Sequence, residues 1–211
     1  MMKILFQGDS ITDCGRNTSN GSMISIGQGY AMLVCAALGY KYPQEYEFEN
    51  RGISGNRVVD VYSRIKADGW NLEPNVFSIL IGVNDVWHEI GGGNGVDAAR
   101  YEKVYRMMIE DTLERLPDTK FMILEPFVLK AAATEEKWDE FKREVALRAA
   151  AAKRVAEDYN LVFVPLQEKF DAAAEKTNDA SYWLADGVHP TPAGHGLIAE
   201  AWLEAFEKNI K

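Results

Sequence analysis

Short apolar runs alternate with longer amphipathic ones along most of this chain, and each short run ends in a cluster of Gly, Asp, Asn or Pro. This alternation is typical of βαβ units, in which helices join parallel strands. The short runs predict strands, and because they lack strict apolar–polar alternation we expect them to be buried on both faces. They occupy residues 3–7, 46–50, 76–81, 121–125 and 161–164.

The longer runs predict helices at residues 29–39, 57–68, 101–116, 138–159 and about 192–208. In the third of these, five mostly apolar side chains recur at helical spacing on one face and should face the core. They are Tyr101, Val104, Tyr105, Met108 and Thr112. Two segments rich in Gly, Asn, Ser or Thr, 15–27 and 91–95, predict surface loops.

Taken together, the elements predict a three-layer α/β/α fold, with helices on both faces of a five-stranded parallel sheet in the flavodoxin-like order 2-1-3-4-5. The length of 211 residues predicts a single domain over 1–211. Apolar residues make up 47% of the chain and charged residues 26%, which excludes a disordered or fibrous protein.

The charge and the cysteines narrow the classes of partner. With 32 acidic and 23 basic residues, the net charge of -9 disfavours nucleic acid and anionic membranes and suits a neutral small-molecule substrate. Cys14 and Cys35 lack metal or redox spacing and should be free thiols. No apolar run reaches the roughly 18 residues of a membrane span, and the start is too short for a signal-peptide core, so we expect a cytoplasmic protein.

Polar clusters follow the first three predicted strands, at residues 8–12, 50–56 and 82–85. In the expected strand order, the first strand lies between the second and the third, so the three clusters meet at one edge of the sheet. Ligands bind at this edge in doubly wound folds. A hydroxyl, backbone N–H groups and a side-chain amide therefore converge there.

A serine hydroxyl needs a base to become a nucleophile, and the chain has three histidines. We expect His88 to lie on the rim of the site and His195 to serve as a cap or in packing. His189 differs because Asp186 precedes it by three residues, and such a carboxylate can fix the imidazole tautomer. From these residues alone, a metal half-site or a salt bridge remains open.

Four blocks resemble the SGNH hydrolases, also called GDSL esterases and lipases. The first three are Gly-Asp-Ser-Ile-Thr at 8–12, Ile-Ser-Gly at 53–55 and Gly-Val-Asn-Asp at 82–85. The fourth is Asp-Gly-Val-His-Pro at 186–190. They stand in the family's order across nearly the whole chain, and the first block departs from the G-x-S-x-G elbow of α/β-hydrolases.

The resemblance implies that Ser10 attacks an acyl carbonyl, that His189 is the general base and then acid, and that Asp186 orients it. It also implies an oxyanion hole made by the backbone N–H groups of Ser10 and Gly55 and the side-chain amide of Asn84. Glycine allows close backbone approach, and an amide is a neutral donor.

Other polar residues near these blocks have different expected roles. Asp9 and Asp85 should tie loops to backbone N–H groups, and Cys14 as a competing nucleophile is the less favoured interpretation because no dedicated base is evident for it. Four residues are predicted to line the substrate pocket: Asp13, Arg16, Arg57 and Trp87. No phosphate loop or metal-spaced cluster is present, so we expect no cofactor and no metal.

The strings at 8–16, 29–30 and 84–87 are most similar to bacterial carbohydrate acetylesterases of the acetyl-xylan type. This narrower resemblance implies hydrolysis of short acetyl esters on a small acetylated sugar. A lysophospholipase or thioesterase, deacetylation of a sugar other than xylan, and a catalytically silent binding module are the alternatives. Assembly into a homo-oligomer is left open.

Overall fold

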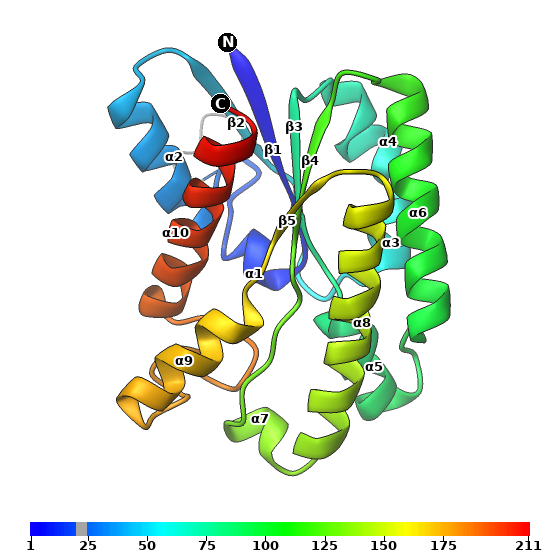
Figure 1. Ribbon diagram of the computed structural model, residues 1–211, viewed down its shortest axis with the longest axis vertical. Helices are drawn as coiled ribbons and strands as arrows, with labels where there is room; N and C mark the ends of the chain where they lie inside the picture. The colour runs from blue at the N-terminus through cyan, green and yellow to red at the C-terminus, as the bar shows by residue number, and fades with distance from the viewer. Residues whose placement is uncertain (20–24) are drawn as a thin grey trace.

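The computed structural model describes residues 1–19 and 25–211, and within them it forms a five-stranded parallel sheet in the order β2-β1-β3-β4-β5 (Figure 1). The strands are β1 Met2–Gly8, β2 Tyr46–Asn50, β3 Val76–Leu80, β4 Lys120–Leu124 and β5 Val162–Val164. Both the α/β class and the predicted strand order are confirmed. All five predicted strands are present, with their ends shifted by no more than one residue.

The register of the central strands brings their carboxyl ends together. Phe6 of β1 pairs with Asn50 of β2 on one side and with Ser78 of β3 on the other. Gly8 at the end of β1 pairs with Leu80 at the end of β3. The three polar clusters that follow these strands therefore start side by side, at the edge of the sheet far from both chain termini (Figure 1).

Helices cover both faces of the sheet. One face is covered by α2 Tyr30–Lys41 and α10 Pro192–Asn209, and the other by α3 Val58–Ser63, α4 Ile65–Asp68, α6 Ala98–Arg115 and α8 Trp138–Asp158 (Figure 1). The other helices are α1 Ser10–Asp13, the 3-10 helix η1 Trp70–Leu72, α5 Val83–Gly92, α7 Ala132–Glu135 and α9 Gln167–Thr177. None of the described helices is both long and apolar enough to cross a membrane.

Two apolar layers form the core, one on each face of the sheet. Successive side chains of β1 alternate between them: Ile4 and Phe6 belong to one layer and Leu5 to the other. All five residues of β3 are buried. The edge strands β2 and β5 are only partly buried, so the prediction of burial on both faces is wrong for them. An edge strand has a neighbour on one side only, which leaves part of it open to water.

The helix predictions needed three corrections. The run 57–68 is not one helix: it breaks at Arg64 into α3 and α4. The predicted loop 91–95 starts only at Gly93, whose φ of 65° ends α5. In the part of the chain that the structure describes, four α-helices and one 3-10 helix were not predicted: α1, α5, α7, α9 and η1. Of the predicted loop 15–27, residues 20–24 lie outside the described residues, and the rest has no helix or strand.

Candidate active site

Ser10 is the first residue of α1, directly after β1. The carboxylate of Asp9 caps this short helix by accepting the N–H of Ile11 at 3.0 Å. At Gly8 the turn is so tight that a Cβ atom would lie 2.3 Å from the carbonyl oxygen of Leu80. Glycine is therefore required at this position, and it lets the chain turn from the strand into the helix that presents Ser10.

Ser10, His189 and Asp186 form one hydrogen-bonded chain. Ser10 Oγ lies 2.9 Å from His189 Nε2, and His189 Nδ1 lies 2.7 Å from Asp186 Oδ2. Because the carboxylate accepts a hydrogen bond from Nδ1–H, the proton of the neutral ring stays on Nδ1, and Nε2 has a lone pair directed at the hydroxyl. The structure thus brings together the three residues that the sequence singled out, although 179 positions separate Ser10 from His189.

The loop that holds Asp186 and His189 is itself fixed. Asp186 Oδ1 accepts the N–H of Val188 at 2.9 Å and the N–H of His189 at 2.8 Å. Gly187 makes the turn with a φ of 97°, where a Cβ would lie 2.3 Å from Thr134 Oγ1. The carboxylate and the imidazole are thereby held in one rigid turn.

Opposing effects act on the pKa of Asp186. Partial burial raises it, but the hydrogen bonds from the backbone and ring of His189 and from Val188 outweigh burial, so the pKa lies below its usual value. Asp186 is therefore ionised at neutral pH and can stabilise a protonated imidazole. The side chain of His189 is 45% exposed, so the site is open to solvent.

Asn84 and Gly55 follow the two strands that flank β1. Asn84 lies in the first turn of α5, and its Nδ2 donates to the carbonyl oxygen of Asn56 at 3.1 Å. The amide has two N–H groups, and this bond uses one of them, so the second can point elsewhere. Gly55 has a φ of 83°, which other residues rarely adopt. Both predicted donors thus stand on segments at the same edge of the sheet as Ser10.

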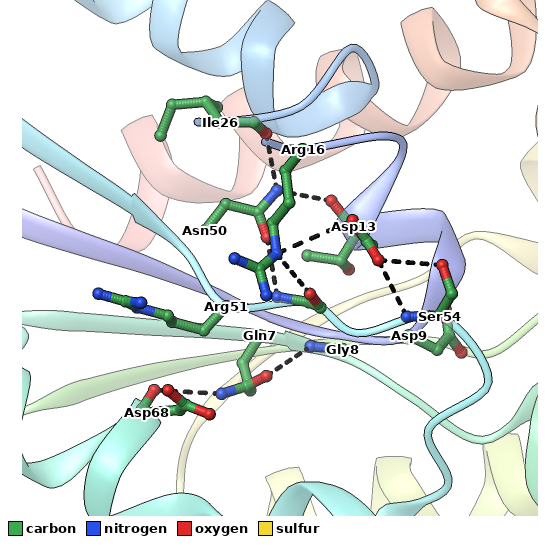
Figure 2. Close-up of polar contacts among 12 residues, drawn as sticks. Gln7, Gly8, Asp9, Asp13, Arg16, Ile26, Asn50, Arg51, Ser54 and Asp68 are labelled. Carbon is green, nitrogen blue, oxygen red and sulfur yellow. Dashed lines mark hydrogen bonds and ion pairs between the residues drawn. The ribbon is translucent and has the colours of Figure 1, made fainter. Parts of the chain in front are cut away.

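Asp13 and Arg16 bind the protein's own loop after β2 (Figure 2). Asp13 Oδ2 accepts both the N–H and the hydroxyl of Ser54, each at 3.0 Å. Arg16 Nε donates to the carbonyl oxygen of Gly52 at 2.6 Å. These bonds join the helix that carries Ser10 to the loop that carries Gly55.

Asn50, the last residue of β2, adds hydrogen bonds that connect this loop to the segments of Thr12 and Ile26. Its Nδ2 donates to the carbonyl oxygens of Thr12 and Ile26 at 2.6 and 2.7 Å, and its Oδ1 accepts the N–H of Gly52 at 2.8 Å. The sequence predicted a polar cluster here but not this role, because hydrogen bonds to distant backbone groups leave no local pattern.

Arg57 and Trp87, the other two predicted pocket residues, differ in their surroundings. The guanidinium of Arg57 binds the Asp60 carboxylate and both oxygens of Asn94, at 2.7 to 3.0 Å. The Trp87 ring lies 5.8 Å from the His189 imidazole, measured between centroids, and packs edge-on against Phe141 at 5.9 Å. Of the four predicted pocket residues, Trp87 is therefore the one whose side chain packs beside the His189 imidazole.

Asp9 and Asp85, which are next to Ser10 and Asn84 in the sequence, are buried. Burial raises the pKa of Asp9 to about 7 and that of Asp85 to about 8, against hydrogen bonds that lower both values. Both oxygens of Asp85 face the N–H of Val58, at 3.1 and 3.2 Å. Each side chain therefore ties a loop or helix start to a backbone N–H, in agreement with the sequence-based expectation.

The remaining histidines lie outside the hydrogen-bonded chain. His88 is partly exposed on α5. His195 is 6% exposed, its Nδ1 accepts the N–H of Tyr30 at 3.1 Å, and burial lowers its pKa to about 4. This packing role agrees with the prediction for His195. Among the described residues, no group of three or more His, Cys, Asp or Glu side chains is placed to hold a metal ion.

Comparison with known proteins gives consistent matches over almost the whole chain. The model of the GDSL-like Lipase/Acylhydrolase family matches residues 6–197. An acetylxylan esterase from Geobacillus stearothermophilus is 35% identical over 210 residues, which cover 95% of this chain and 92% of that protein.

Solved structures agree with the sequence matches. Axe2, an acetylxylan esterase from G. stearothermophilus, superimposes with a TM-score of 0.85 at 32% identity, covering 97% of this chain and 93% of that one. A GDSL-like protein from Parabacteroides merdae superimposes with a TM-score of 0.92 at 39% identity, covering 98% and 95%.

Proposed function

This chain belongs to the GDSL-like lipase/acylhydrolase family and is a carboxylic ester hydrolase, and we propose that it removes acetyl groups from carbohydrate through an acyl-enzyme on Ser10. The observation that supports this most is the hydrogen-bonded chain from Ser10 through His189 to Asp186. Its order and distances are those that nucleophilic catalysis by serine requires.

In the proposed first half-reaction, Ser10 Oγ attacks the acyl carbon while His189 Nε2 takes the hydroxyl proton. The carbonyl π electrons move to the oxygen and give a tetrahedral oxyanion. When that intermediate collapses, the C–O bond to the sugar breaks, and His189 returns its proton to the departing alkoxide. Asp186 stabilises the imidazolium without taking its proton.

In the second half-reaction, water replaces the serine hydroxyl as nucleophile. His189 accepts a proton from the water as it attacks the acyl-enzyme, and the collapse returns that proton to Ser10 Oγ. The bond between the acyl carbon and Ser10 Oγ breaks, and acetic acid leaves and releases its remaining proton to the solvent as acetate. The proton transfers between water, Ser10 and the leaving group therefore need only His189, and the proposed scheme uses no cofactor.

The proposed oxyanion donors are the N–H groups of Ser10 and Gly55 and the side-chain amide of Asn84. Each stands after one of three adjacent strands, and the bond from Asn84 to Asn56 fixes the amide beside the loop of Gly55. Such preorganised donors stabilise charge as it develops in the transition state, where one donor is worth roughly 10²- to 10³-fold in kcat.

Two observations favour acetyl groups on carbohydrate over longer acyl chains. The similar enzymes from G. stearothermophilus are named for acetylxylan, and catalytic mutants of Axe2 replace a serine and an aspartate, the residue types of Ser10 and Asp186 here. In this chain the Trp87 ring lies beside His189, where it can close the acyl pocket after a short group.

A panel of substrates tests the proposed specificity. We expect acetate release from acetylated xylo-oligosaccharides or acetylated monosaccharides to exceed hydrolysis of lysophospholipids in kcat/KM. The ratio between the two acetylated classes distinguishes a xylan-type substrate from another small acetylated sugar. Faster hydrolysis of the lysophospholipids would instead support the lysophospholipase or thioesterase alternative.

We further propose that residues 1–211 act as one domain in the cytoplasm, on a small-molecule ester and without nucleic acid or membrane partners. The negative net charge of the chain supports the last two points.

A further inference from the structure

The side chain of Arg64 forms hydrogen bonds with two of the segments that carry the proposed oxyanion donors. Arg64 stands where α3 ends and α4 begins, and its side chain is 16% exposed. Its guanidinium makes five hydrogen bonds within the protein. The acceptors are Asn56 Oδ1 at 2.8 Å, the Arg51 carbonyl at 2.8 Å, Asp68 Oδ2 at 3.2 Å, Gln7 Oε1 at 2.7 Å and the Gly8 carbonyl at 3.4 Å.

These five bonds use the whole donor set of the side chain. A guanidinium has five N–H groups and no acceptor. Nε makes one of the bonds, and Nη1 and Nη2 make two each. No N–H of Arg64 is left for a substrate, so any effect of this residue on the reaction must pass through the segments that it binds.

The first of these segments is the end of β1, two residues before Ser10. Arg64 Nη2 binds the Gly8 carbonyl and also Gln7 Oε1. The same Gln7 oxygen accepts the N–H of Gly8 at 3.2 Å, and the Gln7 amide donates to the Asp68 carbonyl (Figure 2). Gly8 is thus held at both its N–H and its carbonyl, and the peptide that leads to Ser10 is fixed.

The second segment is the loop after β2. Arg64 binds the Arg51 carbonyl at the start of this loop and the Asn56 side chain at its end. Gly55 stands immediately before Asn56. The Asn56 carbonyl in turn accepts the side-chain N–H of Asn84, so the third donor is connected to the same residue.

We infer that Arg64 is a positioning residue that holds the three oxyanion donors, Ser10, Gly55 and Asn84, in a fixed arrangement. This inference rests on the proposed function. A lysine in its place would keep the charge but offers three donors at a single nitrogen, which cannot reach both strand ends and Asn56 with the fork geometry of arginine. The site would then lose the preorganisation of its donors while keeping all of its catalytic groups.

The first test is Arg64→Lys, assayed for hydrolysis of an aryl acetate. We expect kcat to fall roughly 10- to 100-fold with KM little changed, because misplaced donors weaken binding of the transition state and not of the ester. Arg106→Lys is the matched control, since Arg106 is also a partly buried arginine of a helix, but its partners are the carboxylates of Glu102 and Asp158, neither of which belongs to the proposed oxyanion hole. It should keep the wild-type kcat. An unchanged kcat in Arg64→Lys would overturn the inference.

Asn56→Ala gives a second variant that leaves the arginine in place. It removes the acceptor of Arg64 Nε but keeps the backbone carbonyl that binds Asn84. We expect a smaller fall in kcat than in Arg64→Lys, again with KM little changed. A fall in kcat/KM that came only from KM would contradict a role in positioning the oxyanion donors.

A double-mutant cycle separates this inference from the proposed function. If Arg64 acts through the donors, Arg64→Lys should cost less in an Asn84→Ala background than in the wild type, because part of the hole is already lost. If Asn84→Ala lowers kcat but the effects of the two substitutions are additive, the positioning role of Arg64 is overturned and the proposed oxyanion hole is not. Asn84→Ala with full kcat would remove Asn84 from the proposed oxyanion hole and the inference with it.

Discussion

The sulfur of Cys14 lies 3.3 Å from His195 Nε2, and the histidine is the donor in this contact. Nδ1 of the same ring accepts the N–H of Tyr30, so the single proton of the neutral imidazole sits on Nε2. Burial, with a smaller effect of the nearby Asp13 carboxylate, raises the pKa of the Cys14 thiol. A cysteine one turn after Ser10 thus has a histidine beside it, but that histidine cannot take its proton.

Cys14→Ala should therefore keep most of the wild-type rate of aryl acetate hydrolysis. The thiol lacks both a base and a low pKa, the two usual sources of cysteine nucleophilicity. The measurement is kcat of the purified variant, with thermal unfolding recorded as a check on the fold. A loss as large as that of a serine nucleophile would make Cys14 the reacting group.

The three histidines should respond differently to alanine. His189→Ala should lose on the order of a million-fold in kcat, because base and nucleophile act as one unit. His88→Ala should keep most of the rate, and His195→Ala should too at temperatures where it is folded, since neither ring contacts Ser10. Steady-state assays of the three variants against one aryl ester test this. Equal damage from His195→Ala and His189→Ala would overturn the assignment of the base.

His195 should make the protein less stable in mild acid. Its folded pKa of about 4 lies below the usual value of 6.5, so between these values the unfolded chain binds a proton that the folded chain does not. The stability is present above pH 6.5 and falls as the pH drops toward 4. From pH 8 to pH 5, the loss from this group is about 2 kcal/mol.

His195→Asn is the variant for this test, because its side-chain oxygen can still accept the N–H of Tyr30. Urea unfolding at both pH values gives the free energies of unfolding. The loss from pH 8 to pH 5 should be smaller in the variant by about the stated 2 kcal/mol. The same acid sensitivity in both proteins would show that the histidine is not the cause.

Trp87 should set the preference for a short acyl group. An added methylene gains about 0.8 kcal/mol only where it can be buried, and an indole beside His189 leaves little room for it. We expect kcat/KM of aryl esters to fall from acetate through butyrate to octanoate, and Trp87→Ala to reduce this slope. The informative quantity is the ratio of kcat/KM for the acetate ester to kcat/KM for the octanoate ester, since losing the contact with His189 can also lower all rates together. Octanoate as the best wild-type substrate would contradict the acetyl specificity.

The sequence predicted the strands and their order well because the central strands are short, apolar and bounded by polar turns. It also singled out Ser10, Asp186 and His189, which the structure joins by hydrogen bonds, from their residue types and their place in the four blocks. Helix α9 was missed because Phe170 is its one fully buried residue, which leaves no apolar stripe to detect. The break at Arg64 was missed for a related reason: the side chain at this position binds the end of β1 and the loop after β2, and such long-range hydrogen bonds leave no local pattern.

The predicted roles of Asp13, Arg16 and Arg57 show the same limit. Their closeness in sequence to the catalytic blocks suggested contacts with substrate. The structure shows that their polar atoms bind Ser54, Gly52, Asp60 and Asn94, and their place in the substrate pocket stays a prediction. Sequence proximity places a side chain near a site, but only the fold determines which backbone groups it meets.

The most direct test of the account is the rate at which Ser10→Ala releases acetate from an acetylated substrate that the wild type hydrolyses. Without the hydroxyl, no acyl-enzyme can form, and His189 and Asp186 remain to keep the rest of the site in place. We predict that kcat falls on the order of a million-fold while the variant stays folded. A variant that kept more than about a tenth of the wild-type rate, well above any residual catalysis without the nucleophile, would show that Ser10 is not the nucleophile.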